Sequence, residues 1–235
     1  MLITSCYFGT KPSGIYPAPM SENCVFFSNN PDMKAEAECS GWVFLYTPHL
    51  PLSSNKLIGS LQSKYVKFLQ FIDDYTDLDT SGGVLYFDHK FEVTSQHLSA
   101  MLDGNDKAIV IRNTPKLKPT IAHEVEAAMR QERYQYAMPE TLEWVERHVA
   151  TGEYSETVRI VNTGLILYRD PEQARGLTDE IYKVCWQLAQ PECQIIWAVL
   201  SQKFQNMIAR LDWEQVTPLW QERLPFAERT ERMAS

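Results

Sequence analysis

Short continuous runs of apolar residues recur along the chain, and turn-forming residues follow most of them. The runs cover residues 2–8, 24–28, 42–46, 84–87 and 108–111, and a further apolar region, 157–168, is interrupted by Asn162, Thr163 and Gly164. Strands buried on both faces of a sheet have this continuous pattern, whereas strands with one solvated face alternate apolar and polar residues. We therefore expect these runs to form buried strands.

Between the strands, the apolar positions change to helical spacing. Leu61, Tyr65, Phe68 and Ile72 share one helical face, and similar periods cover residues 96–101, 120–133, 139–149, 181–188 and 195–204. Strands interleaved with amphipathic helices predict an α/β fold, in which helices flank a mostly parallel, Rossmann-like sheet. Because ligands of such sheets bind beyond the carboxyl ends of the strands, functional residues should follow the strands directly.

No Gly/Ser-rich linker and no internal repeat divides the 235 residues. We predict a single domain over residues 1–211 and a C-terminal extension over residues 212–235. Trp213, Trp220 and Phe226 indicate that the first part of the extension packs, while its polar end frays.

Composition and charge exclude several classes of function. The 22 Lys and Arg residues against 30 Asp and Glu give a net charge of −8, without the basic stripe that nucleic acid or an anionic membrane requires. No apolar run approaches the roughly 18 residues of a transmembrane helix, and the N-terminus lacks a secretory signal. Five cysteines without a CxxC pair fit reduced thiols. We expect a cytoplasmic protein with no transmembrane segment and no nucleic-acid partner.

The most informative polar residues follow the apolar run 84–87. Asp88, His89 and Lys90 come where this strand leaves the sheet, so Asp88 should lie at the rim of a ligand crevice. A carboxylate there accepts hydrogen bonds from ribose hydroxyls or binds a divalent cation, and Lys90 neutralises a phosphate. The alternative is an ordinary polar strand end, or a turn that Asp88 caps.

A second group of candidates lies near the start of the predicted helix 120–133. His123 and Glu126 are three residues apart, so both side chains can face one direction beside Glu124 and act as a general base or bind a hydroxyl. The alternative is that acidic residues are simply favourable in a first helical turn. A zinc protease is not supported, because the second His of HExxH is missing.

Two further features have a structural and a functional interpretation. Gly164 breaks a strand two residues after Asn162, which permits close approach of a ligand or of neighbouring backbone or, equally, a bulge. Lys64 and Lys67 lie between the apolar positions of a helix, where they fit either a basic ligand-facing surface or the solvated side of that helix.

The order of these segments resembles GT-A glycosyltransferases, and in particular the glycosyltransferase-like family that includes plant proteins linked to mucilage and pectin synthesis. The resemblance covers a basic helix with Lys64, an Asp88-x-Lys90 strand end in place of the usual DxD, and a helix from Thr120 to Ala127 that carries Glu-Ala. It also covers a strand from Arg159 to Arg169 with Asn162 and Gly164, and a final helix with Gln194. Two departures stand out: Lys90 replaces a metal-binding carboxylate, and Gln194 alone remains of an Arg-Asp-Gln signature.

The resemblance implies a glycosyltransferase of polysaccharide biosynthesis, which transfers a sugar from a nucleotide-diphosphate sugar to a glycan or another hydroxyl acceptor. It implies catalytic roles for Asp88, Glu124 and Glu126. It implies substrate-binding roles for Lys64, Asp88, His89, Lys90, His123, Asn162, Gly164, Arg169 and Gln194. A divalent cation, Mn or Mg, would bind at Asp88, or Lys90 would replace it in metal-independent chemistry.

The departures from the family pattern motivate a second hypothesis, a catalytically inactive GT-A-like module that binds a carbohydrate or a protein partner. A nucleotidyltransferase on a related scaffold is less favoured, because no Gly-rich phosphate loop follows the first strand.

Overall fold

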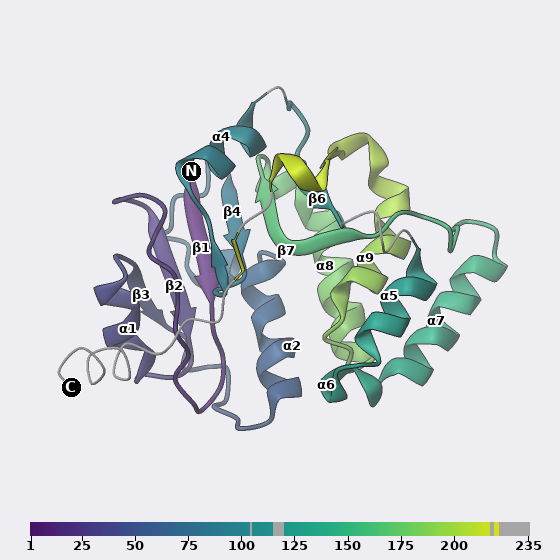
Figure 1. Cartoon of the computed structure of the whole chain (residues 1–235), viewed down its shortest axis with the longest axis horizontal. Coiled ribbons are helices and arrows are strands. Elements are labelled where there is room, and N and C mark those ends of the chain that lie inside the picture. The colour runs from purple at the N-terminus through teal and green to yellow at the C-terminus, as the bar shows by residue number, and fades with distance from the viewer. Residues whose placement is uncertain (104, 115–119, 217–218, 221–235) are drawn as a thin grey trace.

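Seven strands form the main sheet, and one antiparallel strand divides it into two parallel groups (Figure 1). In sheet order the strands are β3 (Val43–Tyr46), β2 (Cys24–Ser28), β1 (Leu2–Cys6), β4 (Val84–Phe87), β7 (Val161–Tyr168), β6 (Ile109–Asn113) and β8 (Ile208–Leu211). β7 runs antiparallel to β4 and β6, and the other neighbouring pairs are parallel. The α/β architecture predicted from the apolar runs, with a mostly parallel sheet flanked by helices, is confirmed.

The computed structural model describes residues 1–103, 105–114, 120–216 and 219–220. Most of the predicted C-terminal extension, residues 217–218 and 221–235, lies outside them. Its described part contains the turn η2 (Trp213–Gln215) and the short strand β9 (Leu219–Trp220), which pairs antiparallel with β5 (Phe91–Glu92). Within the described ranges, no helix combines the length and the apolar composition needed to cross a membrane.

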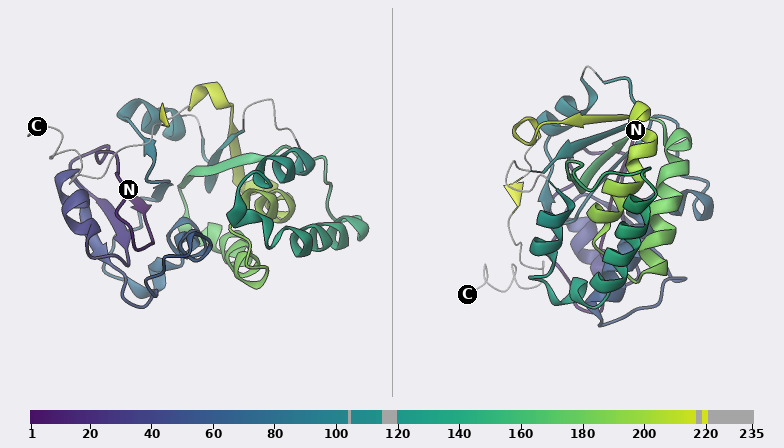
Figure 2. Two further views of the ribbon diagram at one scale, coloured as in Figure 1. Left: turned by 60° about the horizontal axis from the view of Figure 1, so that its bottom comes forward. Right: turned by 90° about the vertical axis from the view of Figure 1, so that its right-hand side faces the viewer.

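Helices cover both faces of the sheet. One core contains buried residues of α2 (Lys56–Lys67), α3 (Phe71–Asp74), α5 (Ile121–Ala128), α6 (Glu132–Gln135), α7 (Met138–Ala150), α8 (Pro171–Gln187) and α9 (Cys193–Leu200). The other core contains residues of α1 (Met33–Cys39) and α4 (Ser95–Leu102). The left view of Figure 2 shows α4 on one side of the sheet and α2 and α8 on the other.

The alternation of side chains along β4 decides which face receives the residues after it. Val84 and Tyr86 pack in the core beneath α2, whereas Leu85 and Phe87 pack in the opposite core. Since successive side chains of a strand point to opposite faces, the side chain of Asp88 is directed to the same side as Tyr86, toward α2.

Two predicted helices are each divided in the structure. The predicted helix with Leu61 and Ile72 on one face ends at Lys67, and α3 follows it, because Leu69 has the left-handed φ of 64° that interrupts helical hydrogen bonding. Similarly, residues 120–133 form α5 and α6 instead of one helix. The apolar pattern did not predict α1, a seven-residue helix that begins two residues after Pro31.

Helix α2 approaches the end of β1 closely enough that one position must be glycine. A Cβ atom added to Gly59 would overlap the carbonyl oxygen of Phe8, a backbone atom with little freedom to move. Glycine therefore sets the distance between α2 and the first strand, and with it the position of the polar residues at the end of α2.

Gly59→Ala should lower the free energy of unfolding by about 1–3 kcal/mol, because the added methyl group pushes α2 away from the strand. Gly176→Ala in α8 is the matched control, since its Cβ would meet Phe204 at an ordinary 3.5 Å. Urea denaturation compares the two variants. Equal destabilisation by both substitutions would contradict the close approach at Gly59.

Candidate functional site at the carboxyl ends of the strands

The ends of β1 and β4 and the start of β7 meet at one edge of the sheet. The register pairs Phe87 with Leu165, and the amide of Asp88 donates to the carbonyl of Gly164 at 2.9 Å. The antiparallel direction of β7 therefore brings Asp88 and Gly164, which are far apart in the sequence, to the same place. The candidate site is built around Asp88 at this edge.

Asp88 forms an ion pair with a buried lysine. Nζ of Lys67, at the end of α2, lies 3.1 Å from Oδ1 of Asp88, and only 5% of the Lys67 side chain is exposed, against 39% of Asp88. The hydroxyl of Tyr86 donates to the same Oδ1 at 2.7 Å. Lys67 and Tyr86 thus hold Asp88 from the side of the sheet that α2 covers, while part of the Asp88 side chain remains open to solvent.

Electrostatics keep this pair charged at neutral pH. Burial opposes ionisation of Asp88, but Lys67 and the hydrogen bond from Tyr86 together hold the pKa of Asp88 below its usual value. Burial likewise disfavours the charged form of Lys67, yet the neighbouring Asp88 raises the pKa of Lys67. Lys64, also buried in α2, contributes to lowering the pKa of Asp88.

His89 connects the strand end to the loop that follows β1. Its Nε2 hydrogen-bonds with Oγ of Ser13 at 3.2 Å, and its ring meets the Tyr7 ring edge-on at a centroid distance of 5.1 Å. Burial, followed by the charge of Lys90, lowers the pKa of His89 to about 4, so this imidazole is neutral at physiological pH. Lys90 is half-buried and forms no ion pair with a described residue.

A second carboxylate is buried beside the start of β7. Nε2 of Gln194 donates to Oε1 of Glu124 at 2.7 Å, and Oε1 of Gln194 accepts from the amide of Thr163 at 3.3 Å. Oγ1 of Thr163 also lies 3.2 Å from Sγ of Cys193. This chain of contacts joins α5, α9 and β7, and it brings the predicted residues Glu124 and Gln194 together.

Two predicted site residues of α5 are not brought to this group. Glu126 is exposed and pairs with Arg130 at 2.9 Å. His123 is exposed, and its Nδ1 lies 2.7 Å from Oγ1 of Thr120 at the start of α5. The two side chains therefore make contacts within and at the start of α5 on its exposed surface. The structure does not bring His123 and Glu126 to Glu124, contrary to the expectation from the sequence.

Arg169 lies at the opposite edge of the sheet from Asp88. Because β7 is antiparallel, its last residue, Tyr168, pairs with Val84, the first residue of β4. Nη1 of Arg169 donates to the carbonyl of Leu102 at 2.8 Å. The antiparallel direction of β7 therefore places Arg169 away from Asp88.

Asn162 and Gly164 make structural contacts at the start of β7. Oδ1 of Asn162 accepts from Nη2 of Arg112 at 3.0 Å and from the Gly164 amide at 3.1 Å. A Cβ on Gly164 would lie 2.5 Å from the Phe91 ring. The glycine therefore leaves room for the Phe91 ring. The register of β7 against β6 also shifts between Asn162 and Ile166, which is the bulge-like irregularity predicted as the alternative.

Arg112 holds the described part of the C-terminal extension. Its guanidinium is buried, donates to the carbonyl of Val216 at 2.6 Å, and lies 4.1 Å from the centre of the Trp213 ring. Burial lowers the pKa of Arg112 to about 10, which still leaves it charged at neutral pH. Sequence patterns missed Arg112, because a charged residue inside an apolar strand has no local signal for its distant partners.

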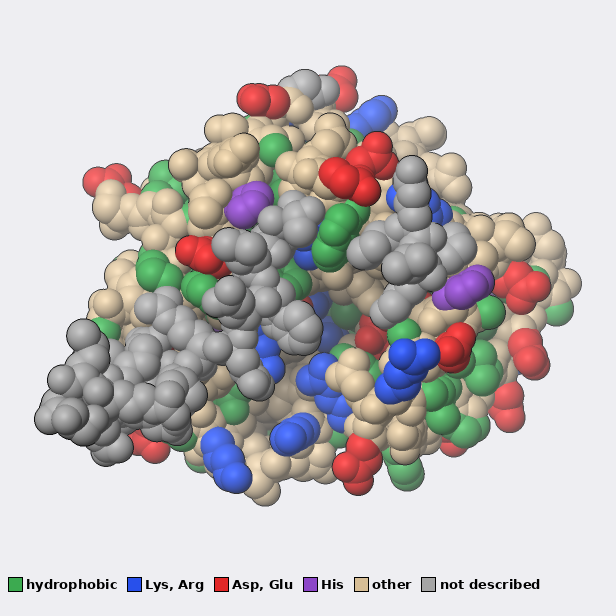
Figure 3. All heavy atoms as spheres, in the orientation of Figure 1, with side chains coloured by type: hydrophobic (Ala, Val, Ile, Leu, Met, Phe, Trp, Pro, Cys, Tyr) green, Lys and Arg blue, Asp and Glu red, His purple; other side chains and the backbone are tan. Residues whose placement is uncertain are grey.

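Lys67 is the other residue that the sequence prediction missed, since Lys64 and Lys67 also fitted a solvated helix face. Both are buried, so that alternative is wrong. The spacing gave a local signal for Lys64, which is three residues after Leu61 and four before Phe68 on the apolar stripe of the helix, but not for Lys67. Figure 3 shows Lys and Arg side chains around a hollow near the middle of the molecular face that is turned to the viewer in Figure 1.

A divalent cation at Asp88 would need several oxygen ligands, about six for Mg²⁺. Oδ1 of Asp88 is already engaged by Lys67 and Tyr86, and the next residues are His89 and Lys90. Among the residues that the structure describes, no three His, Cys, Asp or Glu side chains gather in a way that could hold a metal. The side chains around Asp88 therefore do not fit a divalent cation held by the protein.

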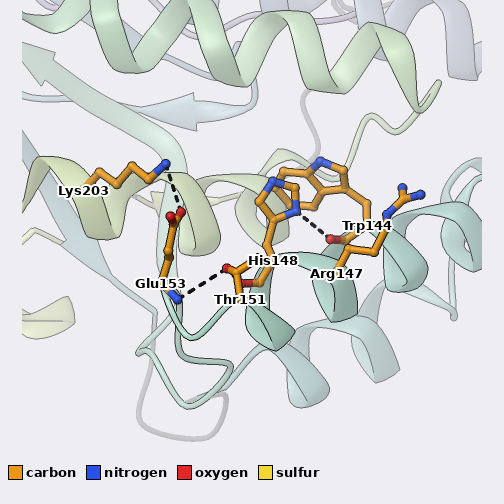
Figure 4. A pocket seen from close by; sticks show the side chains of 6 residues that line it. All are labelled: Trp144, Arg147, His148, Thr151, Glu153 and Lys203. Atoms are coloured by element: carbon orange, nitrogen blue, oxygen red, sulfur yellow. Dashed lines mark hydrogen bonds and ion pairs between the residues drawn. The ribbon is translucent and has the colours of Figure 1, made fainter.

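A hollow of about 400 Å³ lies elsewhere, between α7 and the 3₁₀ helix η1 (Ser201–Met207) (Figure 4). Its lining consists of Trp144, Arg147, His148, Thr151, Glu153 and Lys203. Nδ1 of His148 lies 2.7 Å from the Trp144 carbonyl, and Lys203 pairs with Glu153 at 3.4 Å. None of the predicted site residues lines this hollow.

Comparisons with known proteins give remote similarity to solved structures. Mouse xyloside xylosyltransferase 1 in its apo form has 11% identity and a TM-score of 0.44 over 90% of this chain and 85% of that chain. A glycosyltransferase involved in glycosylation of the major capsid of PBCV-1 has 12% identity and a TM-score of 0.42 over 100% of both chains. A Bacillus anthracis protein assigned as a glucose-1-phosphate thymidylyltransferase, crystallised with a sucrose, has 10% identity and a TM-score of 0.44 over 99% of this chain and 94% of that chain.

Similarity at this level says nothing of substrate or reaction. No family model matches the chain, and no curated protein matches it. The narrower resemblance to the family with plant mucilage and pectin proteins stays a prediction from the sequence.

Asp88→Asn should destabilise the protein, because Lys67 then has no anionic partner. Removing one partner of a buried ion pair costs about 3–5 kcal/mol, and partial exposure of Asp88 reduces the expected loss to roughly 1–3 kcal/mol. Because the folded-state pKa of Asp88 lies below its usual 3.8, this contribution is present above a pH of about 4 and is lost as the pH falls through the depressed value.

Urea unfolding of both proteins from neutral to acid pH measures the effect. The difference in unfolding free energy between wild type and Asp88→Asn should shrink as the solution becomes more acidic than a pH of about 4. A difference that stays constant through the acid range would show that the charge of Asp88 contributes nothing to stability.

Proposed function

We propose that this protein is a glycosyltransferase that transfers a sugar from a nucleotide-diphosphate sugar to a glycan or another hydroxyl acceptor. The observation that carries the proposal is the charged edge of the sheet, where Asp88 is fixed by buried Lys67 beside Lys64 and Lys90. Cations concentrated at strand ends in a chain of net charge −8 favour a small, strongly anionic ligand over a large polyanion.

The donor diphosphate lies against Lys90 in this proposal, and the ribose hydroxyls donate to the exposed part of Asp88. His89 is neutral and tied to Ser13, so it orders the loop of residues 8–20 beside the nucleotide base without adding charge. A fixed loop and a fixed carboxylate hold the donor in one orientation, which lowers the entropic cost of reaching the transition state.

Transfer forms a bond from the acceptor hydroxyl oxygen to the anomeric carbon and breaks the bond from that carbon to the diphosphate. The bonding electrons leave on the diphosphate oxygen, and nearby lysine charges stabilise them. The acceptor proton passes to a carboxylate, and Glu124 is better suited to this than Glu126, because Gln194 orients it at the start of β7.

Nucleotide binding tests the donor part of this proposal. Isothermal titration calorimetry with UDP and GDP should detect binding of at least one of them. Lys90→Met should weaken that binding on the order of tenfold, since it removes one charge-assisted contact. Lys34→Met is the control, because Lys34 forms an exposed ion pair with Glu38 at 3.7 Å on the outer side of α1. If neither UDP nor GDP binds, with or without manganese, the proposal is overturned.

Glu124→Gln tests the catalytic part. It should reduce kcat by roughly 10²–10⁴-fold, the usual contribution of a general base, with donor affinity retained. Glu126→Gln, which removes the exposed carboxylate, should leave kcat unchanged. Transfer or hydrolysis of nucleotide sugars is measured with both variants. Donor binding without turnover by the wild type, across many acceptors, would favour the inactive binding module instead.

A further inference from the structure

Asp88 already has a cation at contact distance. Nζ of Lys67 lies 3.1 Å from Oδ1, and Tyr86 donates to the same oxygen at 2.7 Å. A metal ion at this oxygen would have to displace the Tyr86 proton and approach a buried ammonium group, at a considerable Coulomb cost. Oδ1 of Asp88 is thus compensated and hydrogen-bonded without an added cation.

We propose that Lys67 takes the place of a divalent cation beside Asp88, so that the donor diphosphate binds without a metal ion. This inference rests on the proposed function, and it assigns Lys67 the role of a positioning residue. Its charge compensates Asp88, and a diphosphate can then approach Lys90 without repulsion from an uncompensated carboxylate.

Lys67 is held in a way that suits a permanent counter-ion. Its backbone carbonyl accepts from the hydroxyl of buried Tyr168 at 2.7 Å, and Nζ lies 5.2 Å from the centre of the Tyr86 ring. The position of its helix is set by the close approach of Gly59 to Phe8. The side chain is ordered in the folded protein, so ligand binding does not incur the entropic cost of ordering it.

The surrounding charges act in the same direction. Besides Lys67, the groups that lower the pKa of Asp88 are the Tyr86 hydroxyl and the charge of Lys64, which also lies on α2. From β6, buried Arg112 is close enough for Asp88 to act on its pKa. Several cations therefore act on this one carboxylate without a metal ion.

The experiment measures how a metal ion changes affinity for UDP and GDP. Calorimetric titrations are run in EDTA and, separately, in manganese, for wild type and for Lys67→Met. Wild type should bind equally well in both conditions. Lys67→Met should lose affinity on the order of tenfold in EDTA and regain it in manganese, because Asp88 is then free to bind a cation.

Two further variants separate this role from a merely structural one. Lys67→Met combined with Asp88→Asn should show no manganese response, because no carboxylate remains to bind the metal. Lys34→Met controls for binding of manganese to the nucleotide itself and should behave as wild type. Circular dichroism checks that each variant folds. If Lys67→Met does not fold, Lys67→Arg is compared with the wild type instead, and both proteins should bind UDP or GDP equally well in EDTA and in manganese.

The outcomes distinguish the two proposals. Wild-type binding only in manganese would overturn the role of Lys67 and leave the glycosyltransferase proposal intact. Failure of UDP and GDP to bind in either condition would overturn both. Loss of affinity in folded Lys67→Met that manganese does not restore would also overturn the counter-ion role.

Discussion

The antiparallel pairing of β4 with β7 is the interaction on which the arrangement of this protein depends. It joins the parallel group β3-β2-β1-β4 to the group β6-β8 in one sheet. It also brings the start of β7 beside the end of β4, where the Asp88 amide donates to the Gly164 carbonyl. A parallel strand in this place would have presented its other end, with Arg169, to the same site.

Burial and charge are balanced at this edge by specific contacts. Lys67 is almost entirely removed from solvent, which would be strongly unfavourable for an isolated ammonium group. Asp88 compensates it, Tyr86 satisfies the same carboxylate oxygen, and the close packing of α2 at Gly59 keeps the partners in contact. The pair thus contributes to the stability of the fold and to the electrostatics of the site at once.

The second half of the site is organised by hydrogen bonds between elements that are distant in sequence. Glu124 of α5, Gln194 of α9 and Thr163 of β7 form one connected group. Arg112 then links the start of β7 to the described part of the C-terminal extension, through Asn162 and Val216. Each contact depends on helices and strands that meet only after the sheet has formed.

The sequence by itself determined six of the seven strands of the main sheet, most of the helices and the presence of polar residues at the end of β4, because these follow from local apolar periodicity; it did not predict β8 or the short pair β5 and β9. It located Asp88 at a strand end and identified Glu124 and Gln194 as candidates, which the structure brings together. Only the tertiary structure decided the rest: the direction of β7, the distance of Arg169 from the site, and the exposure of His123 and Glu126. It also revealed the buried partner of Asp88. Periodicity reports which face of an element is buried, but strand direction and ion-pair partners depend on contacts between segments far apart in the chain, so no local pattern encodes them.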